Sequence, residues 1–167
     1  MGDQNEREAR RWLATANRDL EAARWNRAGE FFNTACFQAQ QAVEKALKAF
    51  LLAHGERNVR GHSALELLDR CVAFSAEFAR FRQDCRVLDR HYIPTRYPDA
   101  LPEGSPHEAF GSDDADDAIR RADGILTAVR ESLGLRQDAV EAADSEEDSA
   151  SAEDIRENNG GNSPPHQ

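Results

Sequence analysis

The sequence predicts an all-α protein, an up-and-down bundle of about five helices followed by a disordered acidic C-terminal tail. Three observations support this fold class. Apolar residues recur at three- and four-residue spacing in several long segments, and no segment alternates with a period of two, so no sheet is expected. The last thirty residues contain almost nothing to bury. A chain of 167 residues with 40% hydrophobic content can form one core, and we expect a single domain.

The acidity of the chain belongs mainly to its C-terminal end. Residues 1–136 contain 20 Lys and Arg against 22 Asp and Glu, whereas residues 137–167 contain one against nine. We therefore predict a helical bundle over residues 5–135 and a disordered acidic tail over residues 136–167. A solubilising role is favoured for the tail over an acidic segment that competes with a polyanion for a basic site. The nearly neutral body offers no general electrostatic argument for nucleic-acid binding.

The sequence also bears on the cellular compartment and on whether the chain can hold a metal or another cofactor. Cys36, Cys71 and Cys85 form no C-x-x-C pair and lie in apolar runs, which is typical of reduced, buried thiols. No apolar run approaches the roughly 18 residues that a membrane span needs, so we expect a cytoplasmic protein without membrane partners. No set of His, Cys, Asp and Glu has the spacing of a metal site, and we predict neither a metal nor another cofactor.

The first two helices form the centre of the predicted fold. Residues 5–27 place four apolar residues on one face, and Gly29 breaks this pattern. Residues 30–54 carry a wide stripe of small and apolar side chains that begins at Phe31, and Gly55 follows in the position of a C-terminal cap. On the second helix Lys45 and Lys48 lie beside Glu44, which favours a solvated face.

The later helices are bounded by polar residues and prolines. Ser63 and Glu66 have the spacing of a capping box that opens the third helix, and Ser75 is expected to cap the fourth. Pro94 and Pro98 predict that the fourth helix ends within residues 90–93. Residues 97–112 should form an exposed loop, and the run of aspartates from residue 113 opens a last helix. His54 and His62 flank the connector between the second and third helices, and both are interpreted as caps.

Three blocks of sequence, in this order along the chain, resemble the HEPN domain family of small helical domains found in prokaryotes beside minimal nucleotidyltransferases. They read FFNTACFQAQQAVEKALKAFLLAHGE, GHSALELL and LDRHYIPTRYPDA, and the resemblance covers about residues 14–133. It implies a bundle of about five helices that is usually a homodimer. Many members resemble toxins, which are metal-independent endoribonucleases with an R-x4–6-H motif, and the nucleotidyltransferase is their antitoxin. Other members lack the motif and bind nucleotides or partner proteins. The expected partners are therefore a second copy, a minimal nucleotidyltransferase, and RNA or a nucleotide.

One assignment of the motif takes Arg86 and His91 as a catalytic pair. A histidine can move the proton of a ribose 2′-hydroxyl, and an arginine can stabilise the charge of the phosphate in the transition state. Five residues at 100° each separate the two side chains by about 140° on an ideal helix. They converge only if the helix unwinds before His91, or if each acts with a partner chain. A solvated Arg86 and a structural His91 are the favoured interpretations of each residue taken alone.

The other assignment takes Arg96, in TRYPD, as the arginine of the motif. The positions that would then hold the histidine are Leu101, Pro102 and Glu103, so the pair is broken. On this interpretation Arg90, Arg96 and Tyr97 bind a phosphate, a nucleotide or a neighbouring chain. A structural clamp for the turn between the two prolines is equally favoured. The sequence leaves a ribonuclease and a binding module as alternatives.

Overall fold

Helices are the regular secondary structure of the described part of this protein. The computed structural model describes residues 2–134, with side chains described from Gln4 onward, and contains no strand within that range. The helices, in order, are α1 (Gly2–Ala28), α2 (Phe32–Ala53), α3 (Ala64–Val72), the 3-10 helix η1 (Ala76–Phe81), α4 (Arg82–Asp89), the 3-10 helix η2 (Pro98–Ala100), α5 (Pro106–Ala109) and α6 (Ser112–Ser132). The predicted all-α class is therefore confirmed.

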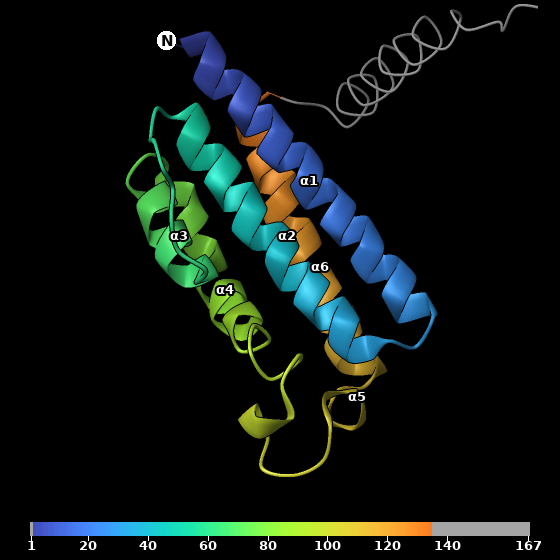
Figure 1. Cartoon of the computed structure of the whole chain (residues 1–167). Coiled ribbons are helices and arrows are strands. Elements are labelled where there is room, and N and C mark those ends of the chain that lie inside the picture. The colour runs from blue at the N-terminus through green and yellow to red at the C-terminus, as the bar shows by residue number, and fades with distance from the viewer. Residues whose placement is uncertain (1, 135–167) are drawn as a thin grey trace, which may run out of the picture. The chain divides into compact units, whose positions relative to one another are not determined.

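Helix α2 lies at the centre of the bundle. It contacts α1, α3, α4 and α6, and α1 runs in the opposite direction to both α2 and α6 (Figure 1). Small side chains allow neighbouring helices to approach it closely. The alanines of α2 that are fully buried are Ala35, Ala39, Ala42, Ala46 and Ala49.

The buried faces follow the predicted periodicity. The four apolar positions predicted for α1 are buried, as are most of those predicted for α2 and α6, whereas Trp25 of α1 is 82% exposed. Phe31 is an exception, because its side chain is 62% exposed and the residue precedes the first turn of α2. The large side chains at the centre of the core include Leu13, Leu20, Leu47, Phe50, Leu51, Phe78, Ile125 and Leu126.

The helix boundaries agree with the predicted start and stop signals, with three differences. The Ser63 hydroxyl accepts the backbone N–H of Glu66 at 3.2 Å, and Gly55 has a positive φ of 93° after α2. The predicted fourth helix is instead divided into η1 and α4, and the hydroxyl of Ser75 donates to the carboxylate of Glu77 rather than capping the helix. The predicted loop at 97–112 contains η2 and α5.

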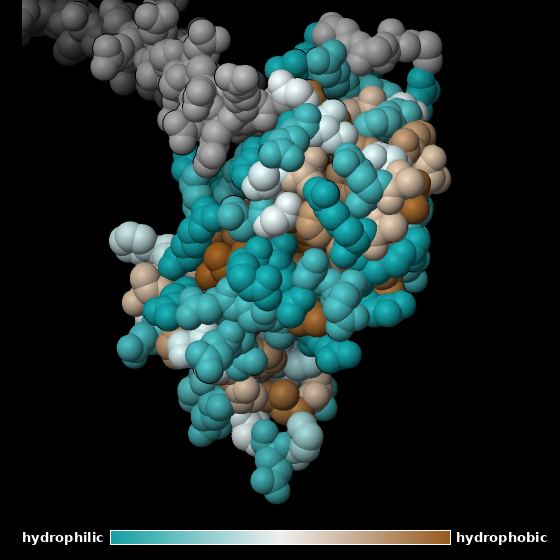
Figure 2. Space-filling model, turned by 180° about the vertical axis from the view of Figure 1, so that it is seen from behind, coloured by the Kyte–Doolittle hydropathy of each residue, from teal (hydrophilic) through white to brown (hydrophobic). Residues whose placement is uncertain are grey.

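The surface seen from behind is largely hydrophilic, and hydrophobic side chains appear there in separate small areas (Figure 2). No described helix combines the length and the apolar composition that crossing a membrane requires. The predicted acidic tail at 136–167 lies outside the described residues.

Candidate functional site

A hydrogen bond joins the turn that follows α4 to the start of α2. Helix α4 ends at Asp89, next to the range that the prolines predict, and residues 90–96 continue as a series of turns. Thr95 is only 2% exposed, and its carbonyl accepts a hydrogen bond from Nδ2 of Asn33 at 3.0 Å. The hydroxyl of Thr95 donates to the carbonyl of His91. These contacts give the TRYPD segment a defined position.

Arg96 lies among three aromatic rings. Its guanidinium carbon is 4.6 Å from the ring centroid of Phe37, 4.5 Å from that of Tyr92 and 5.0 Å from that of Tyr97. Its Nε donates to the carbonyl of Tyr92 at 2.8 Å. Such stacking holds a guanidinium in place and leaves its terminal Nη–H groups available to donate hydrogen bonds. Within the described part of the chain, the Nη groups of Arg96 have no hydrogen-bond acceptor and can bind an anion.

Tyr92 joins this arginine to His62, which is far away in the sequence. The rings of His62 and Tyr92 stack with centroids 5.5 Å apart and an angle of 12° between their planes. The side chain of His62 is 67% exposed, and its Nδ1 lies 3.2 Å from Oε1 of Glu44. The sequence had suggested that His62 caps a helix. In the structure, its imidazole is instead held by a side chain of α2.

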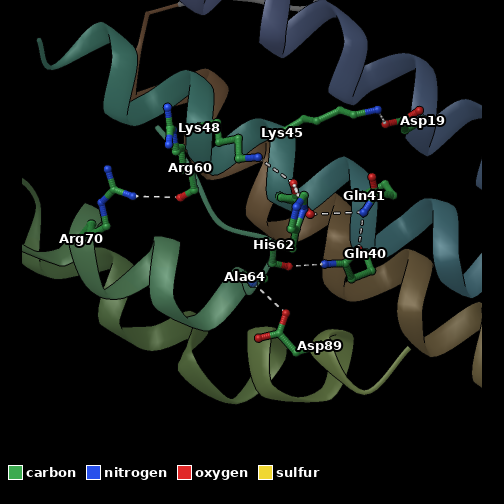
Figure 3. A network of polar contacts seen from close by, with 11 residues as sticks. Asp19, Gln40, Gln41, Lys45, Lys48, Arg60, His62, Ala64, Arg70 and Asp89 are labelled. Atoms are coloured by element: carbon green, nitrogen blue, oxygen red, sulfur yellow. Dashed lines mark hydrogen bonds and ion pairs between the residues drawn. The ribbon is translucent and has the colours of Figure 1, made fainter. Parts of the chain in front are cut away.

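Glu44 is the centre of a buried polar network, and its partners Gln41, Lys48 and His62 are labelled in Figure 3. Its side chain is 5% exposed, and Oε1 accepts Nζ of Lys48, 8% exposed, at 2.7 Å. Its Oε2 accepts Nε2 of Gln41 at 3.2 Å, and Gln40 donates to the carbonyl of His62 at 3.1 Å. The expected solvated face at Lys48 is wrong. The long side chain of Lys48 also packs over Trp12, at 5.3 Å from the ring centroid, which explains its burial.

Arg86 and Arg90 lie at the surface. Both side chains are exposed, and neither forms a hydrogen bond or an ion pair within the described residues. Asp89 lies between them in sequence but accepts hydrogen bonds from the start of α3 instead. Two cationic groups near the end of α4 are therefore available to an anionic ligand.

His91 points into a different environment from His62. Its ring meets the edge of Phe110 with centroids 5.6 Å apart, and its Nδ1 is buried without a hydrogen-bond partner among the described residues. Burial lowers the pKa of His91, while the carboxylates of Asp114 and Asp117 on α6 act in the opposite direction. Arg121 and Arg90, rather than Arg86, are the arginines that help to lower this pKa.

The structure therefore groups the predicted residues differently from the two sequence assignments. Arg96, Tyr97 and Tyr92 share one cluster, and His62 joins it through Tyr92. Arg86 is on the exposed surface of α4, whereas the ring of His91 packs beside Phe110. The sequence carried one local signal for the buried network, because Glu44 and Lys48 have the favourable i, i+4 order for an ion pair. No local signal connects Glu44 to His62, which are 18 residues apart.

Within the described residues, no group of three or more His, Cys, Asp and Glu side chains could hold a metal ion. The groups capable of chemistry at this site are imidazoles, guanidinium groups and two tyrosines. Imidazoles can transfer protons, and guanidinium groups can bind phosphate and stabilise developing negative charge. The arrangement suits a ligand that carries phosphate groups.

Known proteins match the chain over most of the bundle. A family model described as the HEPN domain matches residues 9–132. A curated relative from Methanocaldococcus jannaschii, named "Putative toxin MJ1304", is 24% identical over 146 residues, which cover 77% of this chain and 93% of the relative.

Solved structures show the same likeness. The crystal structure of TT1696 from Thermus thermophilus is 39% identical with a TM-score of 0.67, and covers 74% of this chain and 96% of its own. ST0689, described as an archaeal HEPN homologue, is 38% identical with a TM-score of 0.64 over 75% of this chain and 97% of its own. A HEPN domain protein from Thermotoga maritima is 29% identical with a TM-score of 0.59 over 74% of this chain and 98% of its own. The chain belongs to the HEPN domain family.

Proposed function

We propose that this protein is the toxin-type member of a pair with a minimal nucleotidyltransferase, and that it cleaves RNA without a metal ion. Membership of the HEPN family and the toxin name of the Methanocaldococcus jannaschii relative support this proposal. A homodimer and a cytoplasmic location are part of the proposal.

The observation that carries it is the concentration of unpaired arginines after Cys85. Arg86, Arg90 and Arg96 have no acidic partner among the described residues. Many arginines elsewhere do have one, such as Arg27, which forms a two-pronged contact with Asp116. Each nucleotide of RNA carries a negative phosphate, and arginine binds phosphate through its planar set of donors. Uncompensated guanidinium groups on one short stretch fit a polyanionic substrate.

Arg86 and His91 remain the candidate catalytic pair. Burial lowers the pKa of His91, which favours the neutral imidazole, the form that can accept a proton. Arg86 would stabilise the phosphate in the transition state. Because the two side chains lie in different environments within one protomer, the pair would form between protomers of a dimer.

The test is incubation of the purified full chain with RNA in the presence of EDTA. We expect cleavage, and we expect Arg86→Ala and His91→Ala each to reduce it by about a hundredfold or more. His107→Ala is the matched control, because His107 is exposed on α5 and bonds only to Ser105 within the described chain. Absence of cleavage by the unaltered protein would remove the ribonuclease claim, and undiminished cleavage by His91→Ala would remove His91 from the mechanism.

The nucleotidyltransferase partner requires a separate experiment. Expression of the chain alone should arrest growth of a bacterial host, and co-expression with a minimal nucleotidyltransferase should restore growth. The two proteins should also co-purify. Growth arrest that the partner does not relieve would contradict the pairing without affecting the claim of RNA cleavage.

The aromatic cage around Arg96 favours a second candidate, a non-catalytic module that binds a nucleotide or a protein through Arg90, Arg96 and Tyr97. A guanidinium held among three rings is positioned without ligand, which lowers the entropic cost of binding a phosphate group. Nucleotide-dependent chemical-shift changes at Tyr97 without RNA cleavage would favour this module. Titration of the full chain with AMP, ATP and GTP, monitored by NMR, distinguishes it from the ribonuclease.

A further inference from the structure

His62 has the features of a proton-transferring residue. Its Nδ1 lies 3.2 Å from Oε1 of Glu44, and an ionised carboxylate can only accept hydrogen bonds. Glu44 also accepts hydrogen bonds from Lys48 and Gln41. The proton of the neutral imidazole therefore lies on Nδ1, and Nε2 presents a lone pair.

The ring of His62 is held in place and still reaches solvent. Stacking on Tyr92 and the bond to Glu44 set its orientation, and Gln40 holds its carbonyl at 3.1 Å. Two-thirds of the side chain remains exposed, whereas Glu44 beneath it is almost completely buried. A buried carboxylate that orients an exposed imidazole is the arrangement of many general bases.

The ring that stacks on His62 also contacts a guanidinium, a group suited to binding phosphate. Tyr92 contacts the ring of His62 and also the guanidinium of Arg96, whose carbon lies 4.5 Å from the tyrosine centroid. Arg96 lacks a histidine at the spacing of the family motif, because Leu101, Pro102 and Glu103 occupy those positions. The fold instead brings an imidazole from the segment before α3 into contact with Tyr92, the same ring that contacts this arginine.

We propose that His62 is a general base for RNA cleavage at the Arg96 site and that Glu44 is its positioning residue. This inference rests on the proposed ribonuclease function, and it assigns to His62 and Arg96 the roles that the pair of His91 and Arg86 would otherwise have in that reaction. Nε2 of His62 takes the proton of a ribose 2′-hydroxyl, the 2′-oxygen attacks the adjacent phosphorus, and the bond from phosphorus to the 5′-oxygen breaks. The departing 5′-oxygen takes a proton from a solvent water, and protonated His62 returns its proton to the resulting hydroxide. The products are a 2′,3′-cyclic phosphate and a 5′-hydroxyl, and Arg96 offsets the charge on the phosphate.

The experiment compares the full chain with His62→Ala, and with His107→Ala as control, in single-turnover RNA cleavage with EDTA present. We expect His62→Ala to lower the rate about a hundredfold or more. Added imidazole should restore part of the activity, because it can occupy the vacated space and accept the proton. Binding of an uncleavable RNA with 2′-deoxy substitution and the melting temperature should both stay at the values of the unaltered chain.

Four outcomes are informative. Reduced cleavage with intact binding and rescue by imidazole supports the assignment. Cleavage by His62→Ala at the unaltered rate overturns the inference and leaves the proposed function standing. Loss of RNA binding along with cleavage also overturns it, because His62 would then be a binding residue. Failure of the unaltered chain to cleave RNA removes both the proposed function and the base role.

The orientation by Glu44 has a spectroscopic test that does not depend on activity. In the full chain without RNA, the 15N shifts of His62 should report a proton on Nδ1 at neutral pH. In Glu44→Gln the amide can donate to the ring, so the preference should weaken. A proton on Nε2 in the unaltered chain would contradict the assigned direction of the hydrogen bond and the role of Nε2 as base.

Discussion

The carboxylate of Asp89 accepts the backbone N–H of Ala64 at 2.7 Å, so that the end of α4 caps the start of α3. Its other oxygen accepts the hydroxyl of Ser63 at 2.8 Å and the N–H of Leu65 at 3.1 Å. Negative charge at a helix N-terminus is stabilising, because the first N–H groups of a helix have no partner within the helix. The contact also directs Asp89 away from the arginines at 86 and 90 and leaves them uncompensated.

Replacement of Asp89 by Asn should lower the free energy of unfolding by about 1–3 kcal/mol, since one charged acceptor serves three donors. Urea denaturation followed by circular dichroism measures the change. Asp99→Asn is the control, because Asp99 is exposed and has no hydrogen bond or ion pair within the described chain. Equal stability of the two variants would show that the cap contributes nothing.

Lys48 and Glu44 form a buried pair, so substitutions of the two residues should have strongly non-additive effects on the free energy of unfolding. Lys48→Met removes the cation and leaves Glu44 buried with weaker compensation, at a cost of about 3–5 kcal/mol in unfolding free energy. The double variant with Glu44→Gln should lose less than the sum of the two single variants.

Lys45→Met is the matched control for this cycle. Lys45 pairs with Asp19, and these side chains are 24% and 17% exposed, so water can solvate the remaining carboxylate. We expect a smaller loss than for Lys48→Met. Additive effects in the cycle of Lys48 and Glu44 would contradict the structural coupling.

His91 should make stability depend on pH between neutral and weakly acidic conditions. Burial lowers its pKa in the folded protein below the ordinary value of 6.5. As the pH falls below about 6.5, the unfolded chain binds the proton first and the free energy of unfolding decreases, by at most about 1.4 kcal/mol per pH unit. The decrease stops below the folded pKa, and above about pH 6.5 His91 has no effect.

Urea denaturation from pH 7.5 to 5.0 tests this prediction, and His91→Asn should show a flatter profile. His107→Asn is the control and should keep the profile of the unaltered chain. The lowered pKa values of Asp116 and Asp117 act below their ordinary value of 3.8, which lies outside this range. A profile for His91→Asn that equals the unaltered one would contradict the burial of the imidazole.

The three cysteines should react slowly in the folded state. All three are fully buried, and burial raises the pKa of the Cys36 and Cys71 thiols to about 12 and that of Cys85 further. The thiolate is the reactive form, so alkylation by iodoacetamide at pH 8 should be much slower than in 6 M urea. Mass spectrometry at timed intervals measures it, and equal rates in both conditions would contradict the buried environment.

Local patterns in the sequence were sufficient to predict α1, α2, α3 and α6, but not the division into η1 and α4 or the short helices η2 and α5. The spacing of Leu13, Ala16 and Leu20 marks the buried face of α1, because side chains three or four positions apart lie on one side of a helix. The hydroxyl of Ser63 and the positive φ of Gly55 act within a few residues, so their roles are visible in the sequence. The prolines also restrict residues close to them in the chain, so they predicted the end of α4 close to its observed position.

The sequence blocks also identified the family, which the match over residues 9–132 confirms. The same blocks could not show which of the candidate site residues lie together in the folded protein. The letters from Arg86 to His91 form a motif along the chain, but the direction of the His91 ring depends on Phe110, which belongs to a segment 19 residues later.

By itself the sequence determined the all-α class, most helix boundaries, the buried faces and the family, because these properties depend on neighbours within one or two helical turns. Only the tertiary structure decided that His62, rather than His91, shares an aromatic ring with Arg96, and that Glu44 orients it. It likewise decided the burial of Lys48 and the capping of α3 by Asp89. These contacts arise from the packing of α2 against the segments around it, and the relative position of two helices is not encoded in the periodicity of either one.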